Sequence, residues 1–143
     1  MGDNPRTEDA LEWSEEIEFA KDSIERAVSC TSGVYRILQS TDYPRYMGTT
    51  RVLKLGKSDC DLRQEVLNHL QRHTAANRLA RVLKQQAIRL TVACACTDLD
   101  SAGEQERALL REFEDIHWDL PVLNGQRGYE RGTDAHYRDS DDD

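Results

Sequence analysis

The sequence predicts an α/β (α+β) domain in which helices flank a small, mainly antiparallel sheet of three strands. Three short runs alternate apolar and polar residues, as strands with one buried face do, and they lie at 33–39, 51–56 and 88–96. Four longer runs carry apolar residues at helical spacing, and they lie at 11–29, 62–73, 75–86 and 101–118. A chain of 143 residues is long enough for one domain with its own core.

Charge divides the chain into three parts. The net charge is −8, yet residues 1–16 carry six acids against one base and residues 129–143 carry six acids against two. The stretch between them is therefore close to neutral, at +1. We expect an acidic disordered N-terminus at 1–8, a single domain at 9–128 and an acidic disordered tail at 129–143. The acidic ends serve solubility or, alternatively, mimic DNA and compete for a basic groove of the same chain.

The sequence does not indicate a membrane protein or a secreted one. It contains no run of eighteen apolar residues, and its acidic N-terminus lacks an apolar signal stretch. Four cysteines show no disulfide framework, which favours a reducing cytoplasm. We expect Cys94 and Cys96 to be small buried residues of the third strand.

The first helix and the first two strands come before the motif-bearing helix. Acidic residues after Thr7 suit the first turn of a helix, which the apolar stripe extends to residue 29. The strand at 33–39 is followed by a loop rich in turn formers. In the strand at 51–56, strict alternation places Leu53 and Leu55 on one face and Val52 and Lys54 on the other.

The remaining elements carry most of the ionisable candidates. Asp61 is suited to cap a helix at 62–73, on which Glu65, His69 and Arg72 share a face. The helix at 101–118 ends before Pro121.

A basic segment lies in the middle of this acidic protein. Residues 71–90 contain no acid, and their five bases are Arg72, Arg78, Arg81, Lys84 and Arg89. Such a segment is either a solvated helix face or a surface that neutralises phosphates. We therefore expect DNA as a partner.

Four motifs in chain order resemble the GIY-YIG nuclease domain, over about residues 32–128. They are Gly33-Val34-Tyr35, then Lys54-Leu55-Gly56-Lys57, then Leu62-x-x-Glu65-x-x-x-His69, then Glu112 followed by Pro121-Val122-Leu123-Asn124. The first and the last match the pattern of that family. The second has Lys54 in place of a tyrosine, and the third has Glu65 in place of an arginine.

This resemblance implies a metal-dependent endonuclease that hydrolyses DNA phosphodiesters with one divalent cation, Mg²⁺ or Mn²⁺. Glu112 is then the metal ligand, and Tyr35 positions or deprotonates the attacking water. The other catalytic candidates are Lys54, Lys57 and His69. The residues that support the site are Gly33, Gly56 and Asn124.

Glu65 leaves the activity open, because a carboxylate repels a phosphate that an arginine would hold. Either Arg36 or Arg72 replaces the missing cation, or the domain keeps its fold, cuts nothing and binds nucleic acid or a protein partner. A further alternative is an unrelated intracellular regulatory protein. We expect no separate recognition domain in a nuclease of this length, and we expect specificity to come from a partner, a homodimer or the structure of the DNA.

Overall fold

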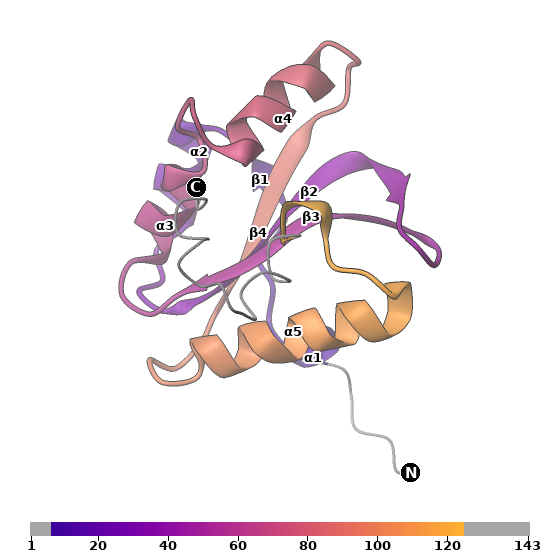
Figure 1. Cartoon of the computed structure of the whole chain (residues 1–143). Coiled ribbons are helices and arrows are strands. Elements are labelled where there is room, and N and C mark those ends of the chain that lie inside the picture. The colour runs from indigo at the N-terminus through magenta and orange to yellow at the C-terminus, as the bar shows by residue number, and fades with distance from the viewer. Residues whose placement is uncertain (1–6, 125–143) are drawn as a thin grey trace.

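Four antiparallel strands form the centre of the structure, a computed structural model that describes residues 7–124 (Figure 1). The strands are β1 (Ile17–Glu18), β2 (Gly33–Pro44), β3 (Thr49–Ser58) and β4 (Leu90–Cys96), and their order across the sheet is β1-β4-β2-β3. The predicted α+β class and antiparallel sheet are confirmed, but the sheet has four strands, not three. The predicted disordered tail at 129–143 and residues 1–6 of the predicted disordered N-terminus lie outside the described residues, but residues 7 and 8 of that predicted N-terminus begin a helix.

The additional strand, β1, lies in the stretch for which the sequence predicted one helix, and that prediction is wrong. The chain instead forms α1 (Thr7–Ala10), β1 and α2 (Lys21–Ala27). Between these helices it follows the edge of β4, where Ser14 exchanges two hydrogen bonds with the backbone of Cys94 and the Phe19 amide donates to the Leu90 carbonyl. An exposed sheet edge offers unpaired backbone groups, and pairing with them outweighs the helical spacing.

Helices cover both faces of the sheet, as Figure 1 shows. On one face, Tyr35 and Ile37 of β2 pack in a core with α2, α3 (Leu62–Asn68) and α4 (Ala75–Lys84). On the other face, Val34 of β2 packs against α5 (Ala102–His117). The alternation of side chains along β2 therefore separates two cores, and each carries different candidate residues.

A bulge in β3 corrects the predicted faces of that strand. Ile37 pairs with Lys54 and the next residue of β2 pairs with Val52, which leaves Leu53 as an extra residue. Leu53 therefore joins the core on the Tyr35 face, whereas Leu55 packs on the α5 face. The predicted shared face for these two leucines is wrong.

Helix α3 is capped as predicted but is shorter than predicted. The Asp61 carboxylate accepts a hydrogen bond from the Gln64 amide at 3.0 Å, and the helix ends at Asn68 with His69 as its C-cap. Arg72 lies beyond the helix, so the predicted face shared by Glu65, His69 and Arg72 stops at His69.

A disulfide joins Cys30, just before β2, to Cys96 at the end of β4. This pairing contradicts the expectation of no disulfide and of Cys96 as a buried thiol, and it removes the cysteine argument for a reducing compartment. Cys94 is buried, as predicted. Within residues 7–124, no helix has the length and apolar character needed to cross a membrane.

The 3₁₀ turn η1 (Val122–Asn124) closes the described chain along the outer edge of β3. The side-chain amide of Asn124 donates to the Leu55 carbonyl at 3.0 Å and accepts from the Leu55 amide at 2.8 Å. Asn124 thus takes the place that a further strand would occupy.

Candidate active site

Tyr35 is the centre of a hydrogen-bonded cluster on the α3 face of the sheet. Only 1% of its surface is exposed. Its hydroxyl lies 2.7 Å from Nε2 of His69 and donates to Oε2 of Glu65 at 3.1 Å. Three polar side chains are therefore in contact in a place where burial strengthens electrostatic interactions.

Gly56 makes room for this cluster. It stands opposite Tyr35 in the β2–β3 pairing. A Cβ atom at Gly56 would overlap the Cζ and the hydroxyl of Tyr35, so the phenol lies directly over the backbone of β3. The glycine thereby allows the Tyr35 hydroxyl to lie over β3, the edge strand of the sheet.

Helix α3 supplies the two other members. Glu65 and His69 are four residues apart, so they lie above one another on the same side of the helix, with 3.6 Å between Oε2 and Nε2. The start of α3 is anchored by the Leu62 amide, which donates to the Thr31 carbonyl, and by the Arg63 guanidinium, which donates to the Val28 carbonyl. Arg63 is thereby directed away from the cluster.

The protonation states follow from burial and from the neighbouring groups. Burial, reinforced by the negative charge of Glu65, raises the pKa of Tyr35 well above its usual value, so the phenol keeps its proton at neutral pH. The His69 ring, 3.6 Å away, and the hydrogen bond from Tyr35 lower the pKa of Glu65 against the opposing effect of burial, so this carboxyl is ionised. Tyr35 is consequently suited to positioning a group, not to removing a proton from water.

Two lysines and a further glutamate extend the cluster along β3. Lys54 stabilises the ionised forms of both Glu65 and Glu106, because its charge lowers the pKa of each carboxyl. The ammonium of Lys57 binds Asp59 at 2.9 Å, and this hydrogen bond raises the pKa of Lys57. The predicted residues Tyr35, Lys54 and His69 are therefore brought together on the α3 face of the β2–β3 pair, whereas Lys57, which pairs with Val34, projects beside α5 on the other face of the same end.

Glu106 is the member that the motifs did not indicate. Burial raises the pKa of its carboxyl, and the positive charges of Lys54, Lys57 and Arg107 oppose that rise. One signal in the sequence points to it. Glu106 occupies a position of the helical stripe that otherwise carries buried apolar residues, namely Ala102, Leu109 and Phe113. An acid in such a stripe is either partnered or functional.

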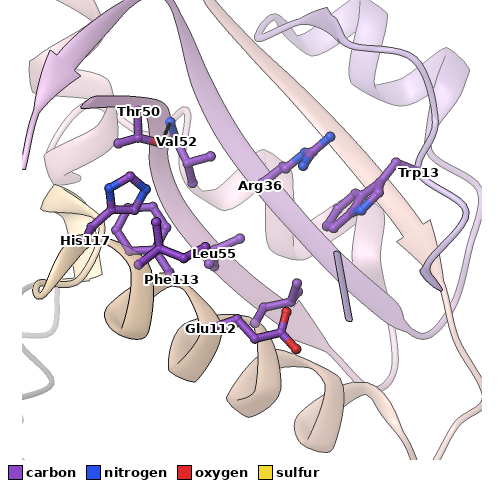
Figure 2. Close-up of a pocket in the computed structure, with 10 residues that line it drawn as sticks. Trp13, Arg36, Thr50, Val52, Leu55, Glu112, Phe113 and His117 are labelled. Atoms are coloured by element: carbon purple, nitrogen blue, oxygen red, sulfur yellow. Dashed lines mark hydrogen bonds between the residues drawn. The ribbon is translucent and has the colours of Figure 1, made fainter. Parts of the chain in front are cut away.

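Glu112 lies elsewhere, although the sequence predicted it as the metal ligand. Its carboxylate accepts three hydrogen bonds from Thr7, two from the backbone amide at 2.9 and 3.0 Å and one from the hydroxyl at 2.6 Å. It lines a cavity on the α5 face of the sheet together with Trp13 and Arg36 (Figure 2). The structure therefore separates Glu112 from Tyr35 and gives it a partner at the start of α1.

The predicted basic residues form an exposed surface on and around α4. All five side chains are exposed, and they are Arg72, Arg78, Arg81, Lys84 and Arg89. Arg78 donates a hydrogen bond to the His73 carbonyl. The buried side of α4 carries Ala76 and Leu83, so its cations point away from the core. Arg36, the other cation considered from the sequence, instead stacks over Trp13 at 4.2 Å on the opposite face of the sheet.

The remaining support residues act through the backbone. A Cβ atom at Gly33 would overlap the carbonyl oxygen of Ala95, so this position needs a glycine for close approach of β2 and β4.

Neither a protein-family model, nor a curated protein, nor a solved structure matches the chain.

Proposed function

We propose that the chain is a metal-dependent endonuclease of the GIY-YIG type that hydrolyses DNA phosphodiesters. The observation that carries the proposal is the hydrogen-bonded group of Tyr35, His69 and Glu65 beside two lysines and Glu106. Hydrolysis of a phosphodiester needs a base for the attacking water, cations for the phosphate and a carboxylate that holds a metal ion. Each of these needs has a candidate within this cluster.

His69 is the group that exchanges protons with the attacking water. Tyr35 contacts Nε2, so Nδ1 is the ring nitrogen that takes the proton as the water oxygen bonds to phosphorus. The imidazolium that forms then donates through Nε2 to the Tyr35 oxygen, whose own proton is directed at Glu65. As the water oxygen bonds to phosphorus, the bond from phosphorus to the leaving oxygen breaks, and the departing alkoxide takes a proton from solvent, to which the imidazolium later returns its own. Glu65 therefore stabilises the charge on His69, as a carboxylate does for a catalytic histidine.

This role for Glu65 accounts for its departure from the family pattern. Its charge is directed at His69 and Tyr35, not at the substrate. Lys54, which lowers the pKa of Glu65, supplies the positive charge that the missing arginine would have brought. Lys57 adds a second ammonium at the end of the same strand.

Glu106 is the residue that we assign to the metal ion, in place of Glu112. The pKa of its carboxyl is raised by burial, so the ionised form lacks part of the stabilisation that a cation provides. A hard cation such as Mg²⁺ or Mn²⁺ takes one or two carboxylates and completes its shell with water and phosphate oxygens, which suits this donor. No group of three histidine, cysteine or acidic side chains within residues 7–124 is arranged to hold a metal ion. When bound, the metal ion neutralises charge on the phosphate.

A nicking assay on supercoiled plasmid, with Mg²⁺ or Mn²⁺ at low salt, tests the proposal. We expect the wild-type chain to nick DNA and His69→Gln to lose about 100-fold or more in rate, because the base is gone. The matched control is His73→Gln, since His73 is an exposed histidine outside the cluster. Equal nicking by both variants would show that the activity resides elsewhere.

The second candidate is a module of the same fold that binds DNA and cuts nothing. It is favoured by the exposed cations of α4 and by the engagement of Glu65 with both Tyr35 and His69. This candidate predicts that salt-sensitive DNA binding persists without nicking and is lost when Arg78 and Arg81 are both changed to Gln. Binding without nicking in the wild-type chain would favour it over the nuclease.

A further inference from the structure

An apolar and aromatic surface lies at the end of the molecule opposite the Tyr35 cluster. It combines the β2–β3 turn with the end of α5 and the start of η1. Its members are large hydrophobic side chains that remain 43% to 74% exposed, and they are Tyr46, Met47, Ile116, Trp118 and Val122. We call these five residues the hairpin patch. Soluble proteins seldom gather so many exposed apolar side chains in one place without a binding partner.

The hairpin patch is held in a fixed arrangement before any partner binds. The Met47 amide donates to the His117 carbonyl at 2.9 Å, and Nδ1 of His117 lies 2.8 Å from the Met47 carbonyl. Arg45 binds Asp119 across the same junction. The β2–β3 turn is therefore tied to the end of α5 on both sides of the aromatic residues, which reduces the entropy lost on binding.

Trp118 occupies a backbone conformation that is unfavourable for a tryptophan. It follows the last turn of α5 with φ 61° and ψ 24°, the left-handed region in which helices usually place glycine. The side chain is 60% exposed and meets the ring of Tyr46 at 5.7 Å between centroids. Burial of the side chain therefore offsets little of the free-energy cost of the left-handed backbone conformation. A strained backbone that carries an exposed aromatic side chain indicates a role in recognition.

Charge selects the kind of partner. The two stretches that frame the hairpin patch, 41–50 and 114–122, hold four acids against one arginine: Asp42, Glu114, Asp115, Asp119 and Arg45. That arginine is 17% exposed and is bound to Asp119. An acidic border repels phosphates, whereas aromatic faces and carboxylates together attract guanidinium and ammonium groups.

We propose that the hairpin patch is a docking surface for an arginine- or lysine-bearing segment of another protein. Tyr46 and Trp118 take the cationic side chain against their faces, and the exposed Asp42 and Asp115 of the framing stretches add negative charge. This surface is separate from the proposed catalytic cluster, since Tyr46 precedes β3 whereas Gly56 and Lys57 lie near its other end. The proposal therefore holds whether or not the chain cuts DNA.

The test measures binding of a fluorescently labelled peptide of alternating arginine and glycine to the full chain, by anisotropy. A peptide of alternating glutamate and glycine controls for charge. We expect the arginine peptide to bind, and we expect its affinity to fall about fivefold or more in Tyr46→Ala and in Trp118→Gly. Leu99→Ala is the matched control, because Leu99 is a 60% exposed apolar residue outside the hairpin patch.

Trp118→Gly also shows that the loss is not unfolding. Glycine suits the left-handed conformation, so this variant should melt at a higher temperature than the wild type while it binds the peptide less tightly. No binding, or equal loss in Leu99→Ala, would overturn the proposal. A preference for labelled oligothymidine, or Trp118-dependent self-association in sedimentation, would overturn it in favour of nucleic acid or a second copy of the chain.

Discussion

Glu106 and Glu112 belong to the same helix, α5, yet their surroundings differ in almost every respect. Glu112 binds the backbone and the hydroxyl of Thr7, so its carboxylate secures the N-terminal segment to the domain. Glu106 is partly buried close to Lys54 and Lys57, and the pKa of its carboxyl is raised. One glutamate has its hydrogen bonds within the protein, and the other has charge that the protein only partly compensates.

The difference between these glutamates shows that the spacing of a motif along the chain does not by itself identify a site residue. The gap from Glu112 to Asn124 fits the family pattern, but spacing along the chain does not determine which side of a helix faces a site. Residues six positions apart on a helix point about 120° from each other. Under the proposed function, a helix rotated relative to the GIY-YIG pattern presents Glu106 to the site in place of Glu112.

The largest expected effect separates the two glutamates by activity. Glu106→Gln should reduce plasmid nicking by about 100-fold or more, since it removes the only charge that we assign to the metal ion. Glu112→Gln should leave the rate within about threefold of the wild type, because its carboxylate serves Thr7. Nicking rates at several Mg²⁺ concentrations check this. A larger loss in Glu112→Gln than in Glu106→Gln would assign the metal ion to Glu112.

A second comparison concerns two glycines near the cluster. Gly56→Ala should lower the free energy of unfolding by about 3 kcal/mol, because the new methyl group overlaps the Tyr35 hydroxyl, which His69 and Glu65 hold in place. Gly103→Ala, in the first turn of α5, should raise it by about 0.5 kcal/mol, because its nearest neighbour, the Arg107 guanidinium, is 3.6 Å away. Urea denaturation measures both, and similar values would contradict the packing of Tyr35 over Gly56.

The smallest expected effect is a difference in pH dependence. The pKa of Glu106 is raised in the folded protein, so the folded state binds its proton more tightly than the unfolded state does. Glu106→Gln should therefore be more stable than the wild type above the folded pKa, and this advantage should disappear as the pH falls through it. Glu112→Gln should instead be less stable at neutral pH by about 1 kcal/mol, since it weakens the bonds to Thr7. Urea denaturation from pH 4 to 8 measures the free energy of unfolding of the wild type and both variants. If this free energy depends on pH in the same way for all three proteins, the raised pKa of Glu106 is contradicted.

Short-range patterns predicted much of the fold. The strands at 33–39, 51–56 and 88–96 lie within or overlap β2, β3 and β4, and Asp61 caps α3, because alternation and capping are local properties of the chain. Glycine and tyrosine motifs also indicated that Tyr35 and Gly56 belong to one site, and they stand opposite each other.

The features that the sequence did not predict depend on contacts between distant segments. Strand β1 forms because the edge of β4 is available, and the bulge at Leu53 arises from the register between two strands. The Cys30–Cys96 disulfide joins residues 66 positions apart, so no local spacing indicates it. Glu106 is marked in the sequence only as an acid within an apolar stripe, whereas Glu112 has the spacing to Asn124 that the motif requires.

Asn124 has a consequence beyond the support of one strand. A sheet grows when another molecule lays its own backbone along the last strand, and this is how many folded proteins begin to form fibres. Because the Asn124 amide already satisfies both the N–H and the C=O of Leu55, a visiting strand meets occupied groups midway along β3. One side chain near the end of the described chain therefore removes one of the backbone pairs that the addition of a strand to β3 would need.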